Sequence, residues 1–185
     1  MPQPGGVRLQ GPHRPRPSAW PGRFRAPQTG SPHHVLLTEL LAAERVRVPL
    51  SARTKDAALE ELVEILHASG AVADPAAVLR AVRQREEQLS TGIGGGVAIP
   101  HGKAEGVGGL TMAAGVSAEP VDFHALDGQP VRLFFLLVGP ESAAGLHVKA
   151  LSRIARLVRG EVRTRLLEAE SPEAFMAVVA EAEAA

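Results

Sequence analysis

The 185-residue sequence contains no cysteine. Disulfide bonds, thiolate nucleophiles and cysteine-ligated metal sites are therefore excluded. Long apolar runs are also missing: Leu133 to Val138 has six residues and none exceeds seven, whereas a membrane-spanning helix needs about 20. The N-terminus lacks the apolar segment of a secretory signal. These absences predict a cytoplasmic protein that does not insert into a membrane.

Acidic residues are missing from the first 34 positions, which hold eight of the 15 prolines and five arginines. Such a segment cannot bury enough apolar surface to offset the entropy lost on ordering. We predict that residues 1–34 are a disordered leader and that residues 35–185 form one domain. The arginines could tether nucleic acid or acidic lipid, but an extension without function is the commoner case. The domain itself carries 15 basic and 20 acidic residues, so no nucleic-acid partner is expected.

The apolar pattern after residue 34 predicts helices alternating with short strands. Leucines at helical spacing indicate a short helix over 36–41, and alternating apolar residues indicate a strand over 46–50. Thr54 and Asp74 are expected to cap the N-termini of the next two helices.

Strands dominate the second half of the chain. Two β segments, 110–116 and 121–123, are separated by a Glu-Pro pair, and the run 131–138 is nearly all apolar, as in a strand buried on both faces. A helix over 145–158 and a last helix capped at Ser171 follow. The chain is therefore predicted to be a single α/β domain with a central mixed parallel and antiparallel sheet flanked by helices on both faces.

The most specific stretch runs from Arg85 to Lys103. Four glycines within residues 92–96 precede the run Val-Ala-Ile-Pro-His. Glycines let consecutive backbone N–H groups point at an anion, and the proline fixes φ just before His101. This setting suits an imidazole that must meet phosphate.

This stretch resembles the phosphorylation-site signature of enzyme IIA domains of the fructose, mannitol and nitrogen class in the bacterial phosphotransferase system. The positions that carry the resemblance are Glu86, Ile93, Gly94, Val97, Ala98, Ile99, Pro100, His101 and Gly102. It continues through the Ser90-Thr91-Gly92 lead-in, the Val121 to Phe123 segment and the apolar run ending in Pro140, and it covers roughly residues 35–183.

The resemblance implies that His101 accepts a phosphoryl group from the phosphocarrier HPr or a paralogue and donates it to a cysteine of an enzyme IIB. In such families the accepting nitrogen is Nε2, while a neighbouring acceptor, which the sequence leaves unassigned, holds Nδ1–H. No metal or other cofactor is implied, in agreement with the absence of a G-x-x-x-x-G-K-[ST] nucleotide-binding loop.

A second histidine gains a role from the resemblance. His147 shares a helical stripe with Leu151, Ile154 and Val158, and this alone indicates a core residue with a hydrogen-bond partner. The resemblance places it opposite His101, where it would donate a hydrogen bond to the phosphoryl oxygens.

Further site residues surround the glycine stretch. Arg85 would offset the phosphoryl charge with its planar fork of donors, or would otherwise pair with a surface acid. Ser90, Thr91, Gly92 and Gly102 are expected to bind phosphate, although the two hydroxyl groups could equally cap or turn the chain.

Other chemistry is less well supported. Glu86 and Glu87 end a helix and are expected to face solvent rather than to act as an acid/base pair. A metal-dependent hydrolase using His101, His147 and Asp122 is a hypothesis outside the family.

Two functions remain open within the family. In the first, the protein is a carrier for uptake of a fructose-type or mannitol-type sugar, with a sugar-specific IIB as partner. In the second, it is a nitrogen-type regulatory protein whose phosphorylation state controls target proteins. Without cysteine or an apolar span, the chain is expected to lack fused IIB and IIC domains and to act as a free subunit.

Overall fold

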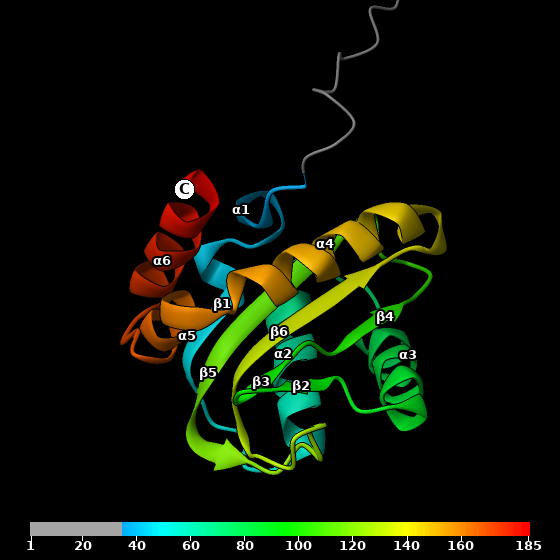
Figure 1. The fold of residues 1–185 in the computed structure, drawn as a ribbon. Helices are drawn as coiled ribbons and strands as arrows, with labels where there is room; N and C mark the ends of the chain where they lie inside the picture. The colour runs from blue at the N-terminus through cyan, green and yellow to red at the C-terminus, as the bar shows by residue number, and fades with distance from the viewer. Residues whose placement is uncertain (1–34) are drawn as a thin grey trace, which may run out of the picture. The chain divides into compact units, whose positions relative to one another are not determined.

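A computed structural model describes residues 35–185 (Figure 1); the predicted leader, residues 1–34, lies outside this range. The sheet within it consists of β1 (Val46–Leu50), β2 (Gly92–Gly94), β3 (Val97–Ala98), β4 (His101–Lys103), β5 (Thr111–Val121) and β6 (Val131–Gly139). The α-helices are α1 (Leu37–Leu40), α2 (Lys55–Ala68), α3 (Pro75–Gln88), α4 (Ala144–Leu157), α5 (Gly160–Leu167) and α6 (Pro172–Ala184). Two short 3-10 helices, η1 (Ala43–Arg45) and η2 (Glu141–Ala143), precede β1 and α4.

The sheet mixes parallel and antiparallel pairs. Its order is β1-β5-β6-β3-β2, and β4 also pairs with β6. The pairs β5–β6 and β2–β3 are antiparallel, whereas β1–β5, β3–β6 and β4–β6 are parallel. Strand β6 therefore has β5 on one side, and β3 and β4 in succession on the other.

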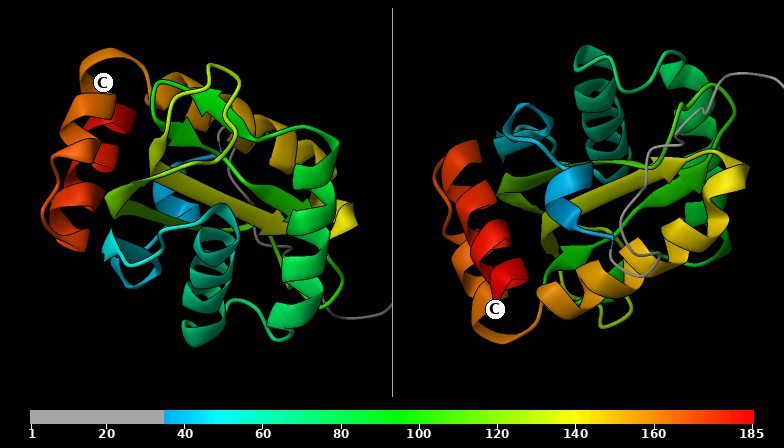
Figure 2. Two further views of the ribbon diagram at one scale, coloured as in Figure 1. Left: turned by 90° about the horizontal axis from the view of Figure 1, so that it is seen from below. Right: turned by 90° about the horizontal axis from the view of Figure 1, so that it is seen from above.

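The alternation of side chains along β6 explains the two layers of helices. Every second residue, beginning at Phe134, belongs to an apolar cluster with α2 and α3. The residues between them, beginning at Leu133, belong to a cluster with α1, α4, α5 and α6. Because successive side chains of a strand point to opposite faces, an all-apolar strand needs apolar cover on both. The predicted fold class is confirmed, with helices on both sides of the sheet (Figure 2).

Three predicted helix starts are confirmed by their caps. In each, the side chain of the N-cap residue accepts a hydrogen bond from the backbone N–H three residues later: Thr54 from Ala57 (3.2 Å), Asp74 from Ala77 (3.0 Å) and Ser171 from Ala174 (3.1 Å). Each bond satisfies a donor that the first turn of a helix leaves free.

Several elements differ from the prediction, and the short strands β2 and β4 were not predicted. The Glu-Pro pair does not separate two strands, because β5 runs on to Val121 with irregular pairing to β6 after Val116. Residues 118–120 are exposed and lie in the irregular stretch between the paired residues Val116 and Val121, where the N–H that proline lacks is not needed for pairing. Helix α5 was not predicted. Its one buried side chain is Leu166, so it shows no apolar stripe.

A buried carboxylate joins the last helix to the first. Glu183 is 5% exposed at its side chain and accepts hydrogen bonds from the backbone N–H groups of Leu37 (2.7 Å) and Thr38 (3.0 Å), the Thr38 hydroxyl (2.9 Å) and Arg153 Nε (2.7 Å). Burial raises the pKa of Glu183, but these donors outweigh burial and hold the pKa below its usual range. The ionised carboxylate thus serves as a remote cap for α1.

Replacing this carboxylate tests its contribution. Glu183→Gln is expected to lower the free energy of unfolding by about 1–3 kcal/mol at pH 7, because a neutral amide replaces an acceptor of charge-assisted hydrogen bonds. The pKa is lower in the folded chain than in the unfolded chain, so the stabilisation is complete above about pH 5 and is lost as the pH falls through the folded-state pKa. Urea unfolding across this range measures the difference.

The matched control is Glu181→Gln on the same helix. Glu181 pairs with Arg165 at the surface, and such exposed pairs contribute little. An unfolding difference for Glu183→Gln that persists undiminished in acid would contradict the role of the ionised carboxylate.

Candidate functional site

His101 lies where the pairing with β6 resumes after an interruption. Strands β3 and β4 both run parallel to β6, and Ile99 and Pro100 connect them. The Pro100 carbonyl accepts a hydrogen bond from Leu137 N–H (3.0 Å), while its ring nitrogen has no hydrogen to offer. His101 is thereby held half-buried at the start of β4.

One hydrogen bond determines which ring nitrogen of His101 can react. Its Nδ1 lies 2.8 Å from the backbone oxygen of Ile99. A carbonyl oxygen can only accept, so Nδ1 carries the hydrogen and Nε2 keeps its lone pair. Burial lowers the pKa of His101, the bond to Ile99 opposes this effect, and the charge of Arg85 lowers the pKa further. The neutral ring is thus a nucleophile at Nε2 near pH 7.

His147 lies opposite this ring. It is 3% exposed, and the ring centroids of the two histidines are 5.6 Å apart with their planes at 62°. Burial lowers the pKa of His147 to about 4, helped by nearby His101 and Lys103 and opposed by Glu141. Its Nδ1 is buried and has no hydrogen-bond partner among the residues described. A buried polar atom of this kind is uncommon and marks a candidate functional group.

Arg85 stands at the C-terminal end of α3. Its Nη1 donates to the Leu89 carbonyl oxygen (2.9 Å), and its charge is close enough to depress the pKa of His101. No acidic side chain within residues 35–185 forms an ion pair with it. The alternative that Arg85 pairs with a surface acid is therefore not supported.

The hydroxyl groups of Ser90 and Thr91 are engaged within the protein. Ser90 Oγ donates to the Phe123 carbonyl oxygen (3.1 Å) and accepts from Gly92 N–H (3.2 Å). Thr91 Oγ1 donates to the carboxylate of Glu86. Both residues turn the chain between α3 and β2, and phosphate binding by them stays a prediction.

Two glycines of the site are required by close packing. A Cβ at Gly92 would lie 2.7 Å from Cβ of Ala125, and one at Gly102 would lie 3.0 Å from the backbone nitrogen of Val82. Strand β4 can therefore pass directly against α3. Contact between these glycines and phosphate also remains a prediction.

The prediction that the glycine run forms an anion cradle beside His101 is wrong. Residues 94–96 have φ values of 97°, 63° and 76°, and residues 95–96 form the turn of the β2–β3 hairpin. Because Gly92 pairs with Ala98, that turn lies at the end of the hairpin away from the histidine. The N–H of the middle glycine donates to Asp127 (2.9 Å). These glycines are needed because the hairpin requires positive φ angles at their positions, and not because they bind an anion.

The prediction that Glu86 faces solvent is also wrong. Glu86 is 6% exposed; Lys55 Nζ lies 2.8 Å from its Oε1, and Thr91 donates to it. The sequence contained a usable signal: Glu86 lies four and eight residues after Val82 and Val78, which are buried on the same face of α3. The prediction relied on the charge of Glu86, which favours solvent, and not on this spacing, which indicates burial.

A comparison with known families agrees with this geometry. Residues 39–182 match the family model described as "Phosphoenolpyruvate-dependent sugar phosphotransferase system, EIIA 2". The chain belongs to this EIIA family. It is therefore a phosphotransferase component, as the sequence predicted.

Individual relatives of this EIIA chain fall into two groups. The PTS system fructose-specific EIIABC component of Bacillus subtilis is 40% identical over 144 residues, which are 77% of this chain and 23% of that longer protein. The PTS system fructose-specific EIIA component of Haloferax volcanii is 40% identical over 129 residues, covering 69% and 84% of the two chains. The crystal structure of nitrogen regulatory protein IIA-Ntr from Neisseria meningitidis has a TM-score of 0.72 at 35% identity, covering 77% of this chain and 98% of that one.

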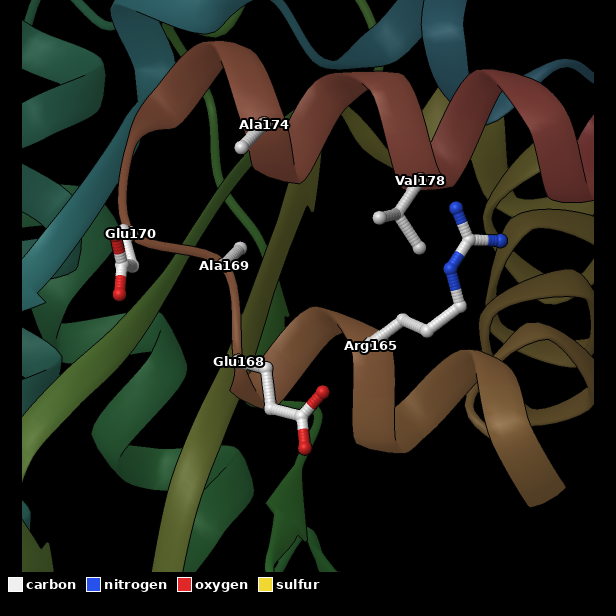
Figure 3. A pocket seen from close by; sticks show the side chains of 6 residues that line it. All are labelled: Arg165, Glu168, Ala169, Glu170, Ala174 and Val178. Atoms are coloured by element: carbon white, nitrogen blue, oxygen red, sulfur yellow. The ribbon is translucent and has the colours of Figure 1, made fainter.

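Other parts of the EIIA domain offer less chemistry. A pocket of about 380 Å³ between α5 and α6 (Figure 3) is lined by Arg165, Glu168, Ala169, Glu170, Ala174 and Val178. It contains neither site histidine. Asp122, which the hydrolase hypothesis requires, is exposed beside His124, and no group of three potential metal ligands occurs within residues 35–185. None of the helices described there is long and apolar enough to cross a membrane.

The protonation of His147 gives a test of the EIIA site. We expect its NMR titration to give a pKa of about 4. Unfolded histidine titrates near about 6.5, so the unfolded chain binds the proton first, and stability should fall as the pH drops from about 6.5 toward 4. In His147→Gln this acid-dependent loss should be smaller. Titration of His147 close to the ordinary histidine value would contradict the buried, neutral state.

Proposed function

We propose that this EIIA protein accepts a phosphoryl group on Nε2 of His101 from HPr or a paralogous carrier and donates it to a cysteine of an enzyme IIB. The observation that carries the proposal is the hydrogen bond from His101 Nδ1–H to the Ile99 carbonyl. The ring centroid of His101 lies 5.6 Å from that of His147, a second neutral imidazole. That bond leaves Nε2 as the nucleophile.

The transfer step conserves atoms and charge. The Nε2 lone pair attacks phosphorus, the new N–P bond forms, and the N–P bond to the carrier's histidine breaks with its electron pair returning to that ring. As Nε2 gains phosphorus, positive charge develops on the His101 ring. The Nδ1–H bond to Ile99 then strengthens, because a charged donor binds a carbonyl more tightly. Transfer to a cysteine thiolate of IIB runs by the same substitution.

Hydrogen-bond donors around His101 and His147 stabilise the negative charge of the phosphoryl oxygens. His147 donates a ring N–H to them, and Arg85 offsets their charge. His147 lies in the first turn of α4, whose N-cap residue, Ala143, provides no side-chain cap. The N–H of Ala144 is bonded to the Glu141 carbonyl of η2, but the positive dipole end of that helix favours an anion at the same place.

The uptake role is supported by the fructose-specific relatives. In this role the IIB partner belongs to a fructose-type or mannitol-type sugar permease, and transfer takes place in the cytoplasm. A regulatory role is the second candidate, because the nitrogen regulatory protein from Neisseria meningitidis is matched over 98% of its length. Both roles require the same phosphorylation of His101.

Phosphotransfer from enzyme I, HPr and labelled phosphoenolpyruvate tests the site. We expect label on the wild type and none on His101→Ala. His147→Ala should be labelled about tenfold to a hundredfold more slowly, because donors aligned on the transferring group are lost. His124→Asn, at an exposed position with a φ of 52° that asparagine tolerates, is the matched control and should be labelled normally. Label that survives in His101→Ala would rule out this acceptor.

Onward transfer separates the two roles. Labelled wild-type protein is mixed with purified IIB of fructose type or mannitol type, and the label on each protein is followed with time. A carrier should lose its label to the IIB cysteine, and a Cys→Ser IIB should receive none. Label that stays on the EIIA protein with every sugar-specific IIB would favour the regulatory role.

A further inference from the structure

A buried charged cluster lies behind the site and has no part in the transfer step described above. It consists of Lys55, Glu86 and Thr91, and we call it the Glu86 cluster. Lys55 Nζ lies 2.8 Å from Glu86 Oε1, and the backbone N–H of Thr91 lies 3.0 and 3.1 Å from the two carboxylate oxygens. The Thr91 hydroxyl donates to the same carboxylate. The Glu86 side chain is 4% exposed, and these partners offset the cost of burying it.

A continuous series of hydrogen bonds leads from this cluster to the reactive ring. Glu86 binds Thr91, the Thr91 carbonyl accepts from Ile99 N–H (2.9 Å), and the Ile99 carbonyl accepts from His101 Nδ1–H (2.8 Å). The buried carboxylate is thus connected to the imidazole through the backbone of two residues.

Both intermediate residues lie outside regular structure. Thr91 falls between α3 and β2, and Ile99 falls between β3 and β4. Backbone in such segments is not fixed by a continuous ladder, so side-chain hydrogen bonds have more influence on its position. The Glu86 carboxylate accepts hydrogen bonds from both the N–H and the hydroxyl of Thr91. Thr91 in turn binds Ile99, whose carbonyl orients His101.

We propose that Glu86 is a positioning residue for His101. Its carboxylate fixes Thr91, which keeps the Ile99 carbonyl in line with Nδ1–H and so keeps Nε2 directed at the incoming phosphorus. Lys55 pairs with this buried carboxylate, and its ammonium also lies 4.7 Å from the centre of the Phe123 ring. The catalytic consequence rests on the proposed function of His101.

Variants must separate positioning from simple stability, because removing one partner of a buried ion pair destabilises most proteins. The double variant Lys55→Met/Glu86→Leu removes both charges and retains bulk, so the fold is expected to survive while Thr91 loses its acceptor. Glu86→Gln keeps an oxygen acceptor in a side chain of the same shape. Glu87→Gln, at the exposed neighbouring position, is the matched control.

The first readout needs no phosphorylation. In ¹⁵N NMR spectra of the unphosphorylated protein at pH 7.5, wild type and Glu87→Gln should show His101 protonated at Nδ1 alone. The double variant should show mixed Nδ1–H and Nε2–H tautomers, because the Ile99 carbonyl is no longer fixed. A change in stability alone would not move this signal in a folded protein.

The second readout is the rate of labelling by phospho-HPr. The double variant should be labelled about tenfold to a hundredfold more slowly, as expected when a nucleophile is misaligned. Glu86→Gln should be several-fold slower, since a neutral amide replaces the carboxylate that Thr91 binds, and it should still be faster than the double variant. This rank order is the signature of partial rescue.

Particular outcomes overturn the proposal. A folded double variant with the wild-type tautomer and labelling rate would show that Glu86 serves stability alone. If the double variant does not fold, Glu86→Gln decides, and a wild-type tautomer with a wild-type rate in that variant overturns positioning. Absence of label in the wild type would instead refute the proposed function of His101, while the tautomer comparison would still test the positioning role.

Discussion

The bond from His101 Nδ1–H to the Ile99 carbonyl is the interaction on which the site depends. A free imidazole exchanges its proton between two nitrogens and presents either of them to a reaction partner. A fixed carbonyl two residues earlier ends this ambiguity, because it accepts only from Nδ1. The protein therefore selects the nucleophilic atom by backbone geometry. A backbone carbonyl has no protonation equilibrium of its own near pH 7, so the selection holds across the physiological range.

The sheet supplies the frame for that geometry. Strand β6 pairs in parallel with β3 through Val97 and Ala98 and again with β4 from His101 onward. The register cannot slip by one residue, since slippage would exchange the two apolar faces that β6 presents to different helices. The short interruption at Ile99 and Pro100 is therefore held between two fixed pairings, and the carbonyl and the imidazole approach each other within it. Helix α4 follows β6 after η2 and brings His147 over the same end of the sheet.

The sequence predicted what depends on local chemistry and missed what depends on long-range pairing. Caps such as Thr54 act within one turn of helix, so their signals are local and were correct. The glycine run was identified as special, but its place relative to His101 follows from hairpin register, which local sequence does not specify. The same limit applies to Ile99, since any of several carbonyls could have held Nδ1–H. Glu86 is a different case. Its spacing from Val78 and Val82 indicates the buried face of α3, whereas its charge indicates solvent. Its partner Lys55 lies some thirty positions earlier in the chain, so local sequence does not reveal the ion pair.

The charges at the site are modest for the phosphoryl acceptor that we propose. Both histidines have lowered pKa values, and the ammonium of Lys55 is matched by Glu86. Arg85 therefore provides the main nearby cation without a described ion-pair partner, with neutral donors and a helix N-terminus beside it. A more cationic pocket would stabilise the bound phosphoryl group as well as the transition state, and such uniform binding slows the next step. In the proposed carrier role the protein must release the phosphoryl group that it accepts, so this weak charge favours transfer in both directions.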